Sequence, residues 1–106
     1  MPKGYWIALV DVHDEEAYKP YALANPAIFK KFGGRFVVRA GKFECPEGRS
    51  RSRNVVIEFP DYATAVACYR SPEYQANLKI RQANAITDLI IVEGYDGPQP
   101  QDFVAL

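Results

Sequence analysis

Residues 5–12 (YWIALVDV) form an apolar run in which both sets of alternating positions carry hydrophobic side chains. Side chains of a strand point alternately to its two faces, so a strand with one face in water alternates between apolar and polar residues. This run therefore predicts a strand that is covered on both faces. That requirement is demanding for a chain of 106 residues, because one small domain has only a thin core and gains stability from a partner.

The remaining strand and helix signals follow in a regular order. Further strands are predicted at residues 35–40, 54–59 and 87–95, with a polar hairpin loop at 44–52, and Asp14, Asp61 and Ser71 are candidate helix N-caps. The order strand–helix–strand–strand–helix–strand predicts an α+β fold of the ferredoxin-like βαββαβ type. Its four strands form one antiparallel sheet, with the first and third strands in the centre.

Proline and glycine residues are expected to divide the first helical region and to mark the end of the domain. Pro20 should bend or shorten the helix. Asn25 followed by Pro26 should begin a second short helical segment, which glycines 33 and 34 should end. We expect a single ferredoxin-like domain over residues 1–95 and a loose Pro- and Gln-rich tail over residues 96–106, whose end (103–106) is suited to dock on a neighbour.

Charge and apolar patterning argue against several classes of partner. Lys and Arg number 13 and are balanced by 13 Asp and Glu, so the cationic surplus that nucleic acids or anionic membranes attract is missing. No apolar run reaches the ~20 residues of a membrane span, and the first residues lead straight into a strand without room for a signal peptide. We therefore expect a cytoplasmic protein with no nucleic-acid or membrane partner. Cys45 and Cys68 read as free thiols, and without a Cys/His cluster no metal or other cofactor is expected.

Strand alternation assigns the side chains to two faces of the sheet. The wholly apolar sets are expected to meet the helices, and they are Phe36 and Val38, then Val55, Ile57 and Phe59, then Ile90 and Val92. The mixed sets should occupy the other face, where a second copy would pack its own sheet and close a homodimeric α+β barrel. That face would bring Arg39, Asn54 and Glu58 together with Trp6 or Tyr5.

Two explanations of these charged residues remain open, because a charge on an enclosed sheet face is costly unless it is paired. One is a pocket for a small organic ligand, in which Arg39 holds a carboxylate or enolate. Trp6, Tyr5 and Asn54 would line this pocket. The other explanation is a cross-strand Arg–Glu pair at the wet rim of the sheet.

Candidates for proton transfer are few. In the pocket interpretation His13 or Glu58 would move protons, although His13, the single histidine, is also explained as a solvated loop residue. Most of the seven tyrosines are expected to be core residues with the hydroxyl near the surface. The basic run at residues 49–53 is interpreted as a solvated hairpin, since nearby glutamates cancel its charge.

Five segments together resemble the family called domain of unknown function 1330. They are residues 4–8 (GYWIA), 32–39 (FGGRFVVR), 55–60 (VVIEFP), 69–75 (YRSPEYQ) and 89–94 (LIIVEG), in this order. The resemblance implies membership of the dimeric α+β barrel superfamily, and hence the ferredoxin-like fold and a homodimer. It implies no single activity, since relatives in that superfamily include cofactor-free monooxygenases, muconolactone-type isomerases, haem proteins and ligand-sensing modules.

Three functions therefore compete. The first is a cofactor-independent enzyme that acts on a small organic acid or enolate-type compound bound in each half of the barrel. The second is a non-catalytic ligand-sensing or structural dimer module. The third is an RNA-recognition domain of the same topology, but its stacking aromatics would fall where this chain has Asn54 and Val56, and the neutral charge argues against it.

Overall fold

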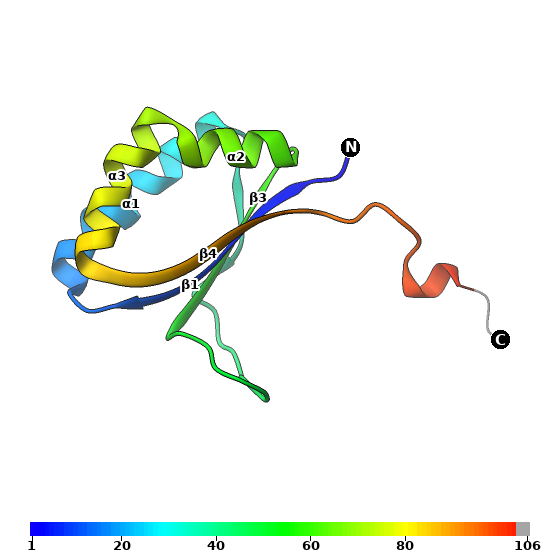
Figure 1. Cartoon of the computed structure of the whole chain (residues 1–106), viewed down its shortest axis with the longest axis horizontal. Helices are drawn as coiled ribbons and strands as arrows, with labels where there is room; N and C mark the ends of the chain where they lie inside the picture. Colours follow the sequence, from blue (N-terminus) through cyan, green and yellow to red (C-terminus); the bar gives the residue numbers. More distant parts are fainter. Residues whose placement is uncertain (104–106) are drawn as a thin grey trace.

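The computed structural model describes residues 1–103, which form a four-stranded sheet with a layer of helices on one side (Figure 1). The strands are β1 (Gly4–Val12), β2 (Arg35–Arg39), β3 (Arg53–Phe59) and β4 (Ala85–Glu93). The helices are α1 (Glu15–Lys31), α2 (Tyr62–Arg70) and α3 (Pro72–Asn84), and a short 3-10 helix spans Pro100–Asp102. The expected docking of residues 103–106 falls, except for residue 103, outside the described residues.

The sheet has the strand order β2-β3-β1-β4, and every neighbouring pair is antiparallel. The predicted α+β, ferredoxin-like arrangement with β1 and β3 in the centre is therefore confirmed. The second helical region is split into α2 and α3 at Ser71. The Ser71 hydroxyl accepts a hydrogen bond from the Tyr74 backbone N–H (3.2 Å), so this residue ends one helix and caps the next.

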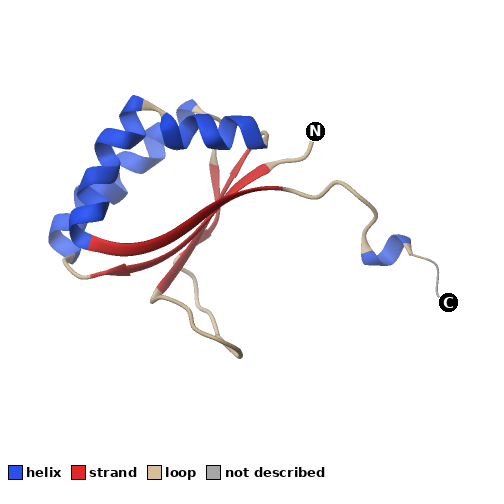
Figure 2. Ribbon diagram, viewed as in Figure 1, coloured by secondary structure: helices blue, strands red, loops and turns tan. Residues whose placement is uncertain are grey.

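The core lies between the helices and one face of the sheet, and the helices leave the other face uncovered (Figure 2). Trp6 is at the centre of the core, where its indole nitrogen donates to the backbone carbonyl of Ala65 at 2.8 Å. Its ring packs against the rings of Phe29, Phe59, Tyr69 and Tyr74. These contacts join β1 to all three helices and to β3, so they hold the helical layer at a fixed position over the sheet.

Helix α1 continues through both Pro20 and Pro26, so the prediction of two shorter helical segments is wrong. Its buried residues are Tyr18, Tyr21, Asn25 and Phe29, which recur every three or four positions and form one stripe. A proline inside a helix costs ~3 kcal/mol, and packing of this stripe outweighs that cost. Asn25 does not cap a new helix, because its side-chain oxygen accepts from Asn77 Nδ2 at 2.8 Å. Gly33, with a φ of 71°, ends the helical region as predicted.

A β-bulge at Val37 reverses the second half of β2. Phe36 faces the helices, but the pairing register shifts between Phe36 and Val38. Arg39 consequently pairs with Val55, which is a helix-side residue. An extra residue in one strand moves every following side chain to the other face. The faces predicted for Arg39 and Val38 are therefore wrong.

The face predicted for Ile90 and Val92 in β4 is also wrong. Ile90 lies opposite Ile7 of β1, on the face that the helices leave uncovered, and is 58% exposed. Leu89 and Ile91 pack against the core instead. Each alternation of this strand is largely apolar and carries one acidic residue, Asp88 on the face of Ile90 and Glu93 on the face of Ile91, so its residue types alone do not distinguish the two faces.

The uncovered side of the sheet is hereafter called the open face. Its apolar side chains are Tyr5, Ile7, Leu9, Val38, Val56, Ile86, Ile90 and Val92. Beyond β4 the tail runs away from the body of the domain (Figure 1). Within residues 1–103 no helix has the length and apolar character needed to cross a membrane.

Candidate functional site

A cavity of about 180 Å³ lies between the helical layer and the sheet. Its apolar wall includes Trp6, Ala8 and Val10 of β1 together with Phe29 of α1 and Leu89 of β4. By simple alternation, β1 turns its even-numbered side chains to the helices and β4 turns its odd-numbered side chains to them. The cavity therefore lies on the covered face of the sheet, not on the open face where the sequence predicted a pocket.

Three arginines line this cavity, namely Arg39, Arg53 and Arg81, and no carboxylate does. The Arg39 guanidinium lies over the ring of Phe36, 4.3 Å from its centroid, and makes no ion pair with a described residue. Arg81 is only 7% exposed, and it too lacks a carboxylate partner within residues 1–103. Burial of a guanidinium without a counter-charge costs free energy. The cavity therefore favours a negatively charged ligand.

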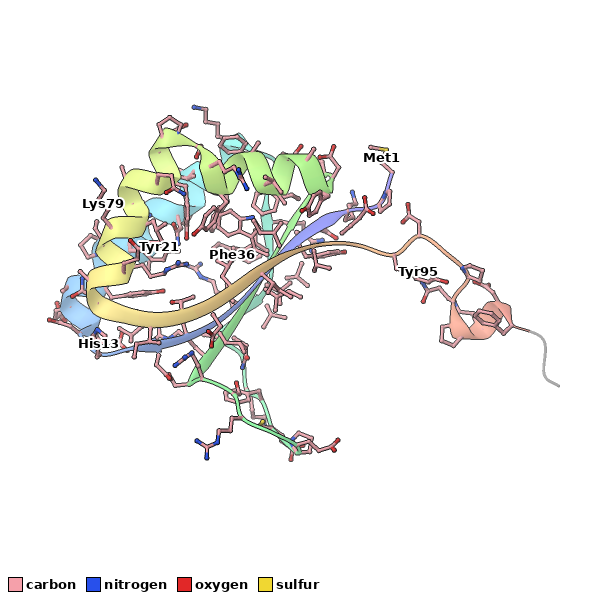
Figure 3. The ribbon with its side chains drawn as sticks, viewed as in Figure 1. Met1, His13, Tyr21, Phe36, Lys79 and Tyr95 are labelled. Atoms are coloured by element: carbon pink, nitrogen blue, oxygen red, sulfur yellow. The ribbon has the colours of Figure 1, made fainter. Side chains whose placement is uncertain are left out.

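Arg81 belongs to a short hydrogen-bond chain behind the cavity wall. Its Nη1 donates to the hydroxyl of Tyr74 at 3.1 Å, and the hydroxyls of Tyr74 and Tyr21 are 2.6 Å apart. Tyr21 and Arg81 line the cavity, whereas Tyr74 is fully buried. Burial raises the pKa of Tyr74 far above its usual range, so this hydroxyl keeps its proton. Figure 3 places Tyr21 in the space between the helices and the sheet.

A second polar group of α1 reaches the same cavity. Asn25 lines it and is 8% exposed. Its side-chain oxygen is occupied by Asn77 Nδ2, which also donates to the backbone carbonyl of Tyr21. The Asn25 N–H₂ group makes no hydrogen bond with a side chain or carbonyl of residues 1–103, so it can donate to a ligand.

A surface depression of about 280 Å³ adjoins the cavity and shares Tyr18, Ala22 and Arg53 with it. There Arg53 Nη2 donates to Glu15 Oε1 at 2.7 Å, and the guanidinium lies 5.6 Å from the centroid of the Tyr18 ring. Burial raises the pKa of Tyr18, so its hydroxyl is a donor at neutral pH.

The residues predicted for the site divide between the two faces. Trp6 and Arg39 line the cavity. Tyr5, Asn54 and Glu58 lie on the open face, on the other side of the sheet. The structure therefore does not bring all the predicted ligand-binding residues together.

Glu58 supports the alternative interpretation, a cross-strand pair on the sheet. The Tyr5 hydroxyl donates to Glu58 Oε1 at 3.0 Å, and Arg35 Nη1 donates to Oε2, also at 3.0 Å. The hydrogen bond from Tyr5, aided by Arg35, lowers the pKa of Glu58. A carboxylate held in its charged form by two donors is poorly suited to accept a proton from a substrate.

His13 lies in the exposed turn between β1 and α1, where its backbone N–H donates to Asn84 O at 3.0 Å (Figure 3). Its side chain is not among those that line the cavity. The basic run of the hairpin is also more structured than expected. Arg51 bridges Asp11 and Asp88 at 3.0 and 2.8 Å and so fastens the loop to β1 and β4.

Sequence reasoning missed Arg81, Tyr21 and Asn25 as site residues. The pattern in α3 contained the signal, because its buried residues are Tyr74, Asn77, Leu78 and Arg81, at positions i, i+3, i+4 and i+7. A charged residue on the apolar stripe of a helix needs a partner or a ligand. Among the described residues no group of three or more His, Cys, Asp or Glu side chains is arranged to hold a metal ion.

The fold and the cavity define a small α+β domain of ferredoxin-like topology with a site between its two layers. The model of the family described as domain of unknown function 1330 matches residues 3–95, so the chain belongs to that family. The comparison with curated proteins found no match.

Solved structures show the same fold at low sequence identity. A protein of unknown function from Rhodopseudomonas palustris is 24% identical, with a TM-score of 0.72, over 91% of this chain and 85% of that one. SnoaB, a cofactor-independent oxygenase from Streptomyces nogalater, is 15% identical, with a TM-score of 0.63, over 94% of this chain and 99% of that one. A dimeric protein of ferredoxin-like fold from Bacteroides fragilis is 15% identical, with a TM-score of 0.50, over 86% of this chain and 95% of that one.

Proposed function

We propose that this protein is a homodimer that binds a small organic anion in the cavity between helices and sheet of each subunit. The observation that carries the proposal is the buried Arg81, a guanidinium at the wall of a largely apolar cavity with no carboxylate partner among the described residues. An anionic ligand would provide the missing counter-charge and so offset the cost of burying the guanidinium.

The size and lining of the cavity indicate the kind of anion. A cavity of about 150 Å³ with an apolar lining is enough to hold benzene, and this one has about 180 Å³. Trp6 and Phe29 offer flat apolar surface, and guanidinium groups match planar carboxylates in geometry. The best fit is a compact, planar organic acid or enolate with an apolar body.

An enzymatic role is supported by the donors around the cavity. Arg39, Arg81 and the Tyr21 hydroxyl could stabilise negative charge on an enolate oxygen, which is a common way to lower the barrier of proton removal or oxygen addition next to a carbonyl group. SnoaB is a cofactor-independent oxygenase on the same fold, but the likeness extends to the fold alone. The proposed enzyme would act on a compound acidic enough to form its enolate without a strong general base from the protein.

A ligand-binding role without chemistry is the second candidate. One observation favours it, because no His, Asp or Glu of the described part of the chain lines the cavity. No side chain that commonly acts as a general base near neutral pH is therefore placed against the ligand. The roles first considered for His13 and Glu58 would require the ligand to reach the outside of the cavity wall, and we do not assign proton transfer to either residue.

The proposed dimer rests on the open face. Its apolar residues include Ile86, Ile90 and Val92 of β4, all exposed in the single chain, and Ile90 and Val92 lie beside Ile7 and Tyr5 of β1 on one surface. Packing of this surface against its copy would cover the second face of β1, which is apolar as well. The dimeric relative from Bacteroides fragilis has the same fold and is consistent with this arrangement.

Calorimetry with a matched pair of probes tests the binding proposal. Benzoate and benzamide have nearly the same size and shape, but only benzoate is charged. We expect benzoate to bind with one site per subunit and benzamide to bind at least about tenfold more weakly, as expected for loss of a charge-assisted contact. Equal affinities, or no binding of benzoate or of any other small planar carboxylate, would contradict the proposal.

A second measurement separates the enzyme from the binding protein. The purified protein is incubated in air with benzoate and with a 1,3-dicarbonyl compound that ionises to an enolate, and the small molecules are followed by mass spectrometry. Conversion of the dicarbonyl compound, absent with the Arg81→Gln variant, supports the enzyme. Full recovery of every ligand that binds supports the non-catalytic role.

A further inference from the structure

We propose that Arg81, Tyr74 and Tyr21 form a directed hydrogen-bond chain that presents the Tyr21 hydroxyl as a donor to an oxyanion of the ligand. This inference rests on the proposed binding function and adds to it a recognition residue and the direction of its hydrogen bond. Nothing in the sequence pattern of α1 marks Tyr21 for this role, because it occupies an ordinary core position of the buried stripe.

The direction of the chain follows from the donors and acceptors that each group has. Arg81 can only donate, so the Tyr74 oxygen is the acceptor of their 3.1 Å hydrogen bond. Tyr74 is fully buried, and the oxygen of Tyr21, 2.6 Å away, is the only acceptor that its hydroxyl meets among the described residues. If Tyr21 donated to Tyr74 instead, the hydrogen of Tyr74 would be buried without an acceptor. Tyr74 therefore donates to Tyr21.

This direction leaves the hydrogen of Tyr21 without a partner inside the protein wall. Tyr21 lines the cavity, so its hydrogen can bond to a ligand there. Its oxygen already accepts a bond from Tyr74, which in turn accepts from a guanidinium. Hydrogen bonds in such a chain polarise one another, and each donor becomes stronger than it would be alone. The Tyr21 hydroxyl, polarised through Tyr74 by the charge of Arg81, is therefore a stronger hydrogen-bond donor to the ligand.

The hydrogen-bond chain of Arg81, Tyr74 and Tyr21 limits the class of ligand that the cavity can bind. Tyr21 supplies an O–H donor, Asn25 supplies an N–H₂ donor, and Arg81 lines the same cavity. A ligand that satisfies these groups must offer oxygen acceptors and negative charge at one end, and the aromatic wall favours a flat apolar body at the other. An aromatic or conjugated carboxylate, or the enolate of a conjugated ketone, meets these requirements. A protonated amine of the same shape would place its own donors against these donors. An alcohol of the same shape would leave the charge of Arg81 unbalanced.

Binding measurements on phenylalanine variants test the role of Tyr21. Tyr21→Phe removes only the hydroxyl, and we expect it to weaken benzoate binding on the order of tenfold. Tyr74→Phe should also weaken binding, but only while Tyr21 is present, so the double variant should bind no more weakly than Tyr21→Phe. Tyr69→Phe is the matched control, because Tyr69 packs against the same core rings without joining the hydrogen-bond chain. The affinity of this variant for benzoate should equal that of the wild type.

A second measurement examines the hydrogen-bond chain in the protein without any ligand. With tyrosine labelled at Cζ, NMR can detect buried hydroxyl protons that exchange slowly with water. We expect a protected proton on Tyr74, and we expect its resonance to move or to be lost by exchange in Tyr21→Phe, which has no acceptor for it. Benzoate should then slow the exchange of the Tyr21 proton. This measurement keeps the inference testable if the Tyr74→Phe variant does not fold.

The outcomes distinguish this inference from the function on which it rests. If the wild type binds no carboxylate, the proposed function and the role of Tyr21 both fail. If the wild type binds benzoate and Tyr21→Phe binds it equally well, only the recognition role fails. Independent, additive effects of Tyr21→Phe and Tyr74→Phe, or a Tyr74 proton that Tyr21→Phe leaves unchanged, would show that the chain does not run in the stated direction.

Discussion

Arg39 and Glu58 lie on opposite faces of the sheet, although simple alternation places them on the same one. Glu58 pairs with Arg35 on the open face, whereas the bulge at Val37 moves Arg39 to the helix side, where it lines the cavity. The two arginines of β2 therefore have separate surroundings. Arg35 makes an ion pair with Glu58, whereas Arg39 has no ion-pair partner among residues 1–103 and lies beside the proposed ligand.

This separation gives a matched test of which face binds the ligand. We expect Arg39→Gln to lower the affinity for benzoate several-fold or more, because a hydrogen bond to a charged group contributes roughly 1.5–3 kcal/mol. Arg35→Gln should leave the affinity unchanged, since its side chain is on the open face. Titration calorimetry on both variants measures the difference. The reverse order of effects would place the ligand on the open face.

The open face should control the oligomeric state. We expect Ile90→Asp to convert the proposed dimer to a monomer, because the new carboxylate would be buried without a partner in the interface. Leu23→Asp is the control, since Leu23 is 72% exposed on α1 in the helical layer. Light scattering coupled to gel filtration measures the mass of each variant. A dimer that survives Ile90→Asp, or a monomeric wild type, would contradict this use of the open face.

Gly4 fixes the approach of β1 to the start of α2. A Cβ atom at this position would meet main-chain atoms of Asp61 and Tyr62, the nearest of them the Asp61 carbonyl oxygen. Gly4→Ala should therefore lower the free energy of unfolding by about 1–3 kcal/mol, the usual cost of overpacking. Gly41→Ala is the control, because a Cβ there meets nothing within 4 Å. Chemical denaturation of both variants provides the comparison, and equal stabilities would overturn the assignment.

The two cysteines should react at very different rates. Cys68 is fully buried, and burial raises the pKa of its thiol to about 12, so almost none of the reactive thiolate is present at pH 8. Cys45 is exposed in the hairpin loop. In the folded protein a thiol reagent should modify one cysteine quickly, and the second should react only after unfolding. Mass spectrometry after timed quenching counts the modified thiols, and rapid double modification of the native protein would be inconsistent with the packing of α2.

Much of the fold could be predicted because it depends on local signals. Asp14, Asp61 and Ser71 cap helices as expected, and the order of elements is enough to specify the sheet topology. The low helix propensity of Pro20 and Pro26 predicts a break in α1, but packing of the buried stripe of Tyr18, Tyr21, Asn25 and Phe29 keeps the helix continuous. Tertiary packing decided that competition.

The site was harder to predict because it depends on which face each strand turns to the helices. The bulge at Val37 has no sequence signature of its own, and it is enough to reverse Arg39. In β4 each alternation is largely apolar with one acidic residue, so the pattern does not decide whether Leu89 or Ile90 faces the helices. Arg81 could have been found from its place on the buried stripe of α3, whereas the 2.6 Å approach of Tyr21 and Tyr74 depends on the packing of two helices and is not encoded at either residue alone.

The most direct test of the account is a crystal structure of the protein grown with benzoate. We predict that the ring lies between the helical layer and the sheet, against Trp6, and that the carboxylate accepts hydrogen bonds from Arg81 and the Tyr21 hydroxyl. Benzoate bound on the open face beside Glu58 and Tyr5, or an empty cavity under conditions that saturate binding in solution, would contradict the central claim.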